Sequence, residues 1–208
     1  MSNEFKQALK ELIETRHATI PWHAGNCGIE IQREHEWQFE TMFTLGDVKK
    51  FNHSYLAAYD SLGFFTHLLT QFSGCVTYHS TTNCYIHGGN LAKSWISDII
   101  HLPPKCPEMR VQYDGIFVPT YFFNSSLEQC KMLLRCLKLL IKEGGFIMVS
   151  LIAGPPDSPG CSMSMEMWEG EFIAAGLQTL RVEAEPVELR IHPTDFHAVV
   201  KLGALDEA

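Results

Sequence analysis

The chain lacks the marks of a secreted or membrane protein. Its 208 residues contain no CxxC pair, and its seven cysteines are an odd number with no spacing typical of a secreted disulfide framework. The opening MSNEFKQALKELIE has no apolar core of a signal peptide, and no segment approaches the roughly 20 apolar residues that span a bilayer. We therefore expect reduced, mostly buried thiols, no membrane partner, and a cytoplasmic or nuclear protein.

Basic runs and metal-ligand motifs are also missing. Lys and Arg number 16 against 24 Asp and Glu, a formal charge of −8, which argues against nucleic acid as the main partner. The ten histidines form no HExxH and no paired Cys/His pattern, so we predict no metal site. A Cys–His nucleophile pair stays open, because such partners meet in space rather than in sequence. No residue is assigned a catalytic role.

The clearest pattern present is a strand, a helix and a second strand. The apolar runs 115–119 and 146–152 are typical of strands covered on both faces. Between them lies an amphipathic helix, which Ser125 and Glu128 would begin as a capping box and Gly144 would end. Two covered strands joined by a helix predict a right-handed βαβ unit.

The rest of the chain extends this pattern into one domain, 1–208. Residues 1–50 would hold a helix at 3–15 and an irregular lid or docking segment, and residues 51–208 the α/β core. The fold class that we predict is a doubly wound, mostly parallel α/β sheet with an antiparallel C-terminal strand pair. The other expected segments are strands at 54–59, 75–79, 180–189 and 196–204, helices at 64–72 and 164–177, and a segment at 91–100 that begins as a helix and ends as the third strand.

Three segments in this order carry a family resemblance. They are ISDIIHLPP as a third strand, YDGIFV as a fourth, and LKLLIKEGGFIMVSL as a helix and fifth strand. Together they resemble the class I S-adenosylmethionine-dependent methyltransferases, over roughly residues 55–202. The resemblance implies a Rossmann-like sheet and S-adenosylmethionine as the cofactor.

The cofactor-binding turn departs from the family's pattern. The resemblance aligns Gly63 with the last glycine of the turn after the first strand, and puts Tyr59 and Ser61 at its earlier glycine positions. Ala57 stands at the acidic position, and Asp60 substitutes for that acid only if the turn is shifted. A ring at position 59 would fill space that the cofactor needs.

Two further cofactor positions follow from the same alignment. His79, or Tyr78 in a shifted register, stands where the family uses an acid to accept both ribose hydroxyls, and neither side chain reproduces that arrangement. Asp98 stands where the family often places an acid that contacts adenine. The resemblance thus leaves two alternatives for the cofactor, none or S-adenosylmethionine.

The acceptor side does not identify a substrate. Pro119, Thr120 and Tyr121 are candidates for a substrate pocket, in a segment comparable with the Asp/Asn-Pro-Pro-aromatic loop of amino-methylating members. The same segment compares with the Asp-containing loop of the seven-strand protein-lysine methyltransferases, with Thr120 at the Asp position. The run that continues through Phe122 and Phe123 fits an acceptor pocket or core packing.

Two functions are therefore compatible with the sequence. The first is a non-catalytic, methyltransferase-like pseudoenzyme that acts as a regulatory or scaffolding subunit through a protein partner, which the resemblance implies by analogy. The second is an active S-adenosylmethionine-dependent methyltransferase of a protein side chain or a small molecule.

Overall fold

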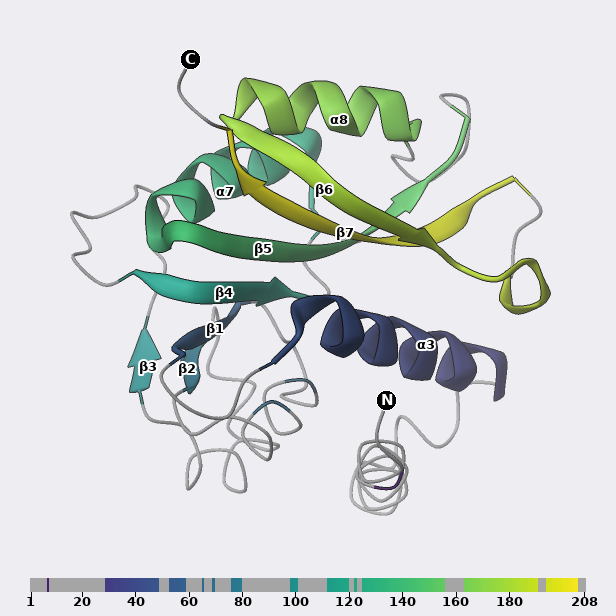
Figure 1. Ribbon diagram of the computed structural model, residues 1–208. Coiled ribbons are helices and arrows are strands. Elements are labelled where there is room, and N and C mark those ends of the chain that lie inside the picture. Colours follow the sequence, from purple (N-terminus) through teal and green to yellow (C-terminus); the bar gives the residue numbers. More distant parts are fainter. Residues whose placement is uncertain are drawn as a thin grey trace.

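The computed structural model contains a mixed seven-stranded sheet in the order β3-β2-β1-β4-β5-β7-β6 (Figure 1). It describes Gln7 and residues 29–48, 53–58, 65, 69, 76–79, 98–100, 112–119, 122, 125–155, 163–190 and 194–205. The strands are β1 (Tyr55–Ala58), β2 (Val76–His79), β3 (Asp98–Ile100), β4 (Tyr113–Val118), β5 (Ile141–Ala153), β6 (Leu177–Ala184) and β7 (Phe196–Ala204). The helices are α3 (Ile29–Gly46), α7 (Leu127–Leu140), α8 (Met165–Ala174) and the short 3-10 helix η2 (Val187–Leu189).

Strand directions confirm the predicted fold class. The pairs β3–β2, β2–β1, β1–β4 and β4–β5 are all parallel. Strand β7 is antiparallel to both β5 and β6, so the chain closes with the expected antiparallel pair. The helix α7 connects two parallel neighbours, β4 and β5, and the sequence expectation of a βαβ unit is met there.

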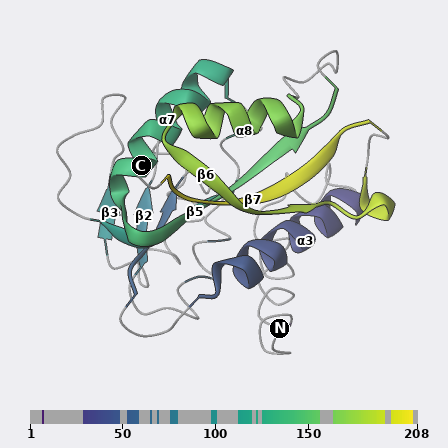
Figure 2. The same cartoon turned by 45° about the horizontal axis from the view of Figure 1, so that its top comes forward.

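Helices cover both faces of the sheet, and side chains alternate between two apolar clusters. Figures 1 and 2 show α7 and α8 on one side of the sheet and α3 on the other. Along β4, Ile116 and Val118 join the cluster under α7 and α8, whereas Phe117 joins the cluster under α3. This alternation follows from the two-residue period of a strand, and it explains why the strand sequences are apolar throughout.

The helix α3 corrects the expectation of an irregular lid or docking segment for residues 29–46. Phe39, Met42 and Leu45 recur at helical spacing, and all three are buried against the sheet. Gln38, beside this stripe, is also buried, which interrupts the apolar pattern in the sequence. Of the helix predicted at 3–15, only Gln7 lies among the described residues, where it is helical.

The ends of α7 differ from the predicted ones. The capping box is formed by Ser126 and Gln129, one residue later than the predicted pair Ser125 and Glu128. Ser126 is extended, its hydroxyl accepts from the Gln129 amide, and the Gln129 side chain accepts from the Ser126 amide. The helix already ends at Leu140, so Gly144 does not end it. Gly144 has the expected positive φ of 72°, but it lies within β5, in the irregular part between the paired residues Ile141 and Phe146.

The helix α8 begins and ends close to the predicted positions. Ser164 caps its first turn by accepting from the Met167 amide, and the helix ends at Ala174. Gly176 follows with a φ of 76°, the left-handed conformation that favours glycine after a helix. Among the residues that the structure describes, no helix has the length and apolar character to cross a bilayer.

Candidate functional site at the carboxyl edge of the sheet

The parallel strands bring their carboxyl ends to one edge of the sheet. Ala58, the last residue of β1, is opposite His79, the last residue of β2, which in turn is opposite Ile100 of β3. In doubly wound sheets, ligands bind in the crevice outside the carboxyl ends of the strands. This edge is therefore the candidate site, and of the predicted residues that the structure describes, His79 ends β2 and Pro119 directly follows β4.

Near the end of β1 lies Ala57, the residue that the sequence alignment puts at the position of the family's acid. Ala57 is the third of the four residues of β1 and is fully buried. It packs in the cluster under α3 together with Tyr55, Phe65 and Phe117. The predicted turn residues Tyr59, Asp60, Ser61 and Gly63 lie outside the described residues, and their proposed roles stay predictions.

The backbone places the other two predicted cofactor residues on β2 and β3. His79 ends β2, the position at which the alignment expects the ribose-binding acid. Asp98 is the first residue of β3, opposite Thr77, and so lies two positions before Ile100 at the carboxyl end. The two residues are on neighbouring strands but not directly opposite each other.

At the end of β4, Pro119 is tied to α3. Gln38, only 1% exposed, donates a hydrogen bond from its side-chain amide to the Pro119 carbonyl oxygen. This contact joins the middle of α3 to the carboxyl end of β4. Thr120 and Tyr121, the other predicted pocket residues, lie outside the described residues. Phe122 is buried and packs edge-on against Trp168 at 5.8 Å, so the core interpretation holds for this ring.

Buried polar groups near the same edge were not foreseen. Glu185, 2% exposed, follows β6; its carboxylate accepts from the His197 backbone amide, and its own amide donates to the His197 carbonyl oxygen. Arg190 donates to the Glu185 carbonyl oxygen and lies 5.0 Å from the Phe196 ring centroid. These bonds fix the link between β6 and β7. Acidic residues after a strand are usually exposed to solvent, so the burial of Glu185 could not be predicted from the sequence.

Ser150 is the least expected of these polar residues. It lies in β5, opposite Val199, and is completely buried. Among the residues that the structure places, none offers its hydroxyl a hydrogen-bond partner. Across the part of the chain that the structure describes, no group of three or more His, Cys, Asp or Glu side chains is placed to hold a metal ion.

Comparison with known proteins gives a result only at the level of structure. No family model matches the sequence, and no curated protein matches it. Among solved structures, an S-adenosylmethionine-dependent methyltransferase from Clostridium acetobutylicum is similar with a TM-score of 0.65 and 8% identity, over 93% of this chain and 98% of that one. This chain has the class I methyltransferase fold.

Two further neighbours support the methyltransferase fold. The YcgJ protein of Bacillus subtilis is similar with a TM-score of 0.64 and 11% identity, over 84% of this chain and 100% of that one. The magnesium protoporphyrin IX methyltransferase of Synechocystis PCC 6803, with bound SAH, has a TM-score of 0.62 and 9% identity, over 86% of this chain and 84% of that one. At these identities the likeness concerns the fold.

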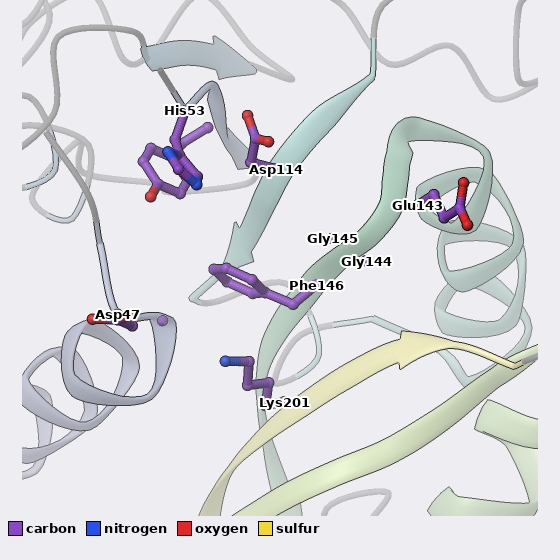
Figure 3. A pocket seen from close by; sticks show the side chains of 10 residues that line it. Asp47, His53, Asp114, Glu143, Gly144, Gly145, Phe146 and Lys201 are labelled. Atoms are coloured by element: carbon purple, nitrogen blue, oxygen red, sulfur yellow. The ribbon is translucent and has the colours of Figure 1, made fainter. Parts of the chain in front are cut away.

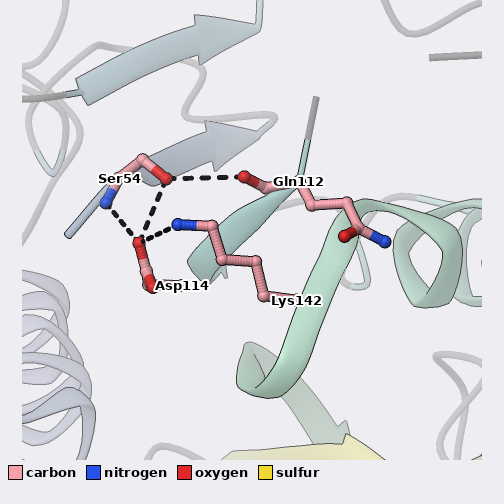
Figure 4. A network of polar contacts seen from close by, with 4 residues as sticks. All are labelled: Ser54, Gln112, Asp114 and Lys142. Carbon is pink, nitrogen blue, oxygen red and sulfur yellow. Dashed lines mark hydrogen bonds and ion pairs between the residues drawn. The ribbon is translucent and has the colours of Figure 1, made fainter. Parts of the chain in front are cut away.

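The methyltransferase fold also has an amino edge, and here it carries a polar network (Figure 4). The Asp114 carboxylate accepts through Oδ2 from the Ser54 amide at 2.6 Å, the Ser54 hydroxyl at 3.1 Å and the Lys142 ammonium at 2.8 Å. Partial burial raises the pKa of Asp114, but these bonds and the charge of Lys142 outweigh it, so the pKa lies below its usual value. Asp114 is therefore ionised at neutral pH, and its hydrogen bonds hold the carboxylate in place.

Proposed function

We propose that this protein is a methyltransferase-like pseudoenzyme that does not use S-adenosylmethionine and acts as a regulatory or scaffolding subunit by binding a protein partner. The observation that supports the proposal is the pair of residues at the ends of β1 and β2. Ala57 and His79 stand where the sequence alignment with the methyltransferases expects two anchoring acids, and Ala57 is packed in an apolar cluster. Neither side chain supplies a carboxylate to a nucleoside.

The expected loss of affinity is large. Leaving a buried hydrogen-bonding group of a ligand unpaired costs about 1–3 kcal/mol. Two missing anchors would therefore weaken cofactor binding by roughly 30-fold to more than 10⁴-fold. The Tyr59 side chain, at a position where the family has glycine, would add to this loss by occupying the space that backbone amides leave for the ligand.

Exposed apolar side chains on α7 and α8 support a protein partner. Met132 and Leu139 on α7 are 46% and 60% exposed, and Met167 and Ile173 on α8 are 47% and 60% exposed. The two helices that carry these side chains cover the same face of the sheet (Figure 1). Exposed apolar side chains that form one patch are typical of protein interaction sites, and we propose that these four contribute to such a patch.

The alternative function, an active methyltransferase, is tested by methyl transfer. Purified protein is incubated with tritiated S-adenosylmethionine and a cell extract, beside the Gly63→Arg variant and an active methyltransferase as the positive control. We expect the protein to add no label above the extract alone. Label that appears with the wild type and is lost in Gly63→Arg would refute the proposal and establish the enzyme.

A further inference from the structure

A cavity at the amino edge of the sheet lies on the opposite side from the candidate site. It has a volume of about 210 Å³, and its walls come from the end of α3, the starts of β1 and β4, residues 143–146 of β5, and β7 (Figure 3). Because it is built from different ends of the strands, it does not depend on the proposed function. Its polar groups form no part of the cofactor crevice expected at the carboxyl edge.

One end of this cavity carries a fixed carboxylate. Within the described part of the chain, the hydrogen bonds of the Asp114 carboxylate go to Oδ2, so Oδ1 keeps its capacity to accept. The Asp114 side chain is 21% exposed and its pKa is lowered, so it stays ionised at neutral pH. Asp47 also lines the cavity and adds negative charge to it. Oδ2 of Asp114 is already paired with the Lys142 ammonium, so Oδ1 and the Asp47 charge are the groups that favour a ligand with an ammonium group.

The other end carries a fixed cation. The Lys201 ammonium donates to the Leu45 carbonyl oxygen at 2.7 Å and lies 4.7 Å from the centroid of the Phe146 ring. These contacts hold the ammonium at one position on the cavity wall. A fixed ammonium group attracts a carboxylate and repels a second ammonium.

An aromatic ring separates the two charges. Asp114 is on β4, Phe146 on β5 and Lys201 on β7, and these strands are neighbours in that order. Because adjacent strands lie about 4.8 Å apart, the backbones of β4 and β7 are about 10 Å apart. In Figure 3, the Phe146 ring lies between Asp114 and Lys201. Across the cavity, the Asp114 carboxylate, the apolar Phe146 ring and the Lys201 ammonium therefore follow one another in that order.

We infer that this cavity binds a small zwitterion, with an ammonium group at Asp114, a carboxylate at Lys201 and an apolar body against Phe146. The chemical class is that of free amino acids and ω-amino acids. A ligand of this size should bind with a Kd on the order of millimolar, because few atoms make contact. Ligands that carry only one of the two charges should bind more weakly.

The inference is tested by an NMR titration with 6-aminohexanoate, n-hexylamine and hexanoate on the ¹⁵N-labelled protein. The reporters are the backbone amides of Gly144 and Gly145, which line the cavity. Gly176 serves as the internal reference, because it lies between α8 and β6 and does not line the cavity. We expect 6-aminohexanoate to shift the two cavity signals saturably and to bind about tenfold more tightly than either analogue, since each charge-assisted hydrogen bond adds to affinity.

Three variants decide where the probe binds. Asp114→Asn keeps the shape and removes the charge, and Lys201→Gln keeps a donor for the Leu45 carbonyl; each should weaken binding of 6-aminohexanoate about tenfold. Glu143→Gln is the matched control, because Glu143 points away from the Phe146 ring, and it should change binding less than about twofold (Figure 3). A Gly176 signal that stays in place shows in each variant that the fold is kept.

Three results would contradict the inference. The inference is overturned if no probe gives saturable shifts, if the two single-charge analogues bind as well as 6-aminohexanoate, or if binding is unchanged in both Asp114→Asn and Lys201→Gln. None of these results bears on methyl transfer at the carboxyl edge, so this test and that of the proposed function fail separately.

Discussion

An acid introduced at position 57 of β1, where the sequence alignment expects one, should destabilise the fold and should not create a cofactor site. In the Ala57→Asp variant, a carboxylate would replace a methyl group that is completely buried among Tyr55, Phe65 and Phe117. The ring centroids of Phe65 and Phe117 are 4.9 Å apart, and those of Tyr55 and Phe117 are 5.9 Å apart, so the described neighbours are closely packed. An unpaired buried charge costs about 3–5 kcal/mol, a large part of the roughly 5–15 kcal/mol that stabilises a domain.

The assay is urea denaturation of wild type, Ala57→Asp and Ala57→Asn at several pH values. Burial raises the folded-state pKa of an Asp above its unfolded value of about 3.9, so the penalty should grow as the pH rises from that value through the folded-state pKa. Ala57→Asn buries a polar group without a charge and should cost about 1–3 kcal/mol at every pH. An Asp variant that is as stable as the wild type at pH 7 would refute the placement of Ala57 in the apolar cluster.

Three further predictions test other parts of the structure. Ser150→Ala should leave the free energy of unfolding unchanged or raise it by up to about 1 kcal/mol, because it removes a buried hydroxyl without a partner; a clear loss in urea denaturation would contradict this. Ser126→Ala should cost about 1 kcal/mol by removing the cap of α7, whereas Ser125→Ala, as its control, should cost far less. The lowered pKa of Asp114 stabilises the fold above its unfolded value of about 3.8, and this contribution is lost as the pH falls through the lower folded-state pKa. Acid titrations should therefore show a weaker loss of stability below about pH 4 in Asp114→Asn, and an unchanged titration would contradict the network with Lys142.

Strand positions were the most predictable part of the fold. The apolar runs around Phe117 and Phe146 are each covered on both faces, and such runs stand out in a sequence whichever helix covers them. The closing pair of strands followed from the short connection between them, which allows only antiparallel pairing in practice. Gly176 could be placed after α8 because a left-handed residue after a helix favours glycine.

Helix positions and buried polar groups were harder to predict. The helix α3 was missed because Gln38 lies on its buried side, where its hydrogen bond to Pro119 replaces an apolar contact. The cap of α7 was shifted by one residue because Ser125 and Ser126 are equivalent in the sequence, and only the backbone conformation selects between them. The burial of Glu185 depends on the β6–β7 link, a tertiary contact with no local signal.

The amino-edge cavity was also beyond sequence analysis. Asp114, Phe146 and Lys201 lie far apart in the chain and come together only through the strand order β4-β5-β7. In the sequence, nothing distinguishes these three residues from other residues in or beside a strand. The order of strands in a sheet is a tertiary property, so a site that crosses three strands appears only in the folded molecule.

Calorimetric titration with S-adenosylmethionine is the decisive test of the proposal that this protein does not use that cofactor. The full chain is titrated with S-adenosylmethionine and then with S-adenosylhomocysteine up to millimolar concentration, with an active methyltransferase measured in the same buffer. We predict no saturable heat for this protein, because the sequence alignment puts Ala57 and His79 at the positions of two anchoring acids. Saturable binding with a micromolar Kd would contradict it.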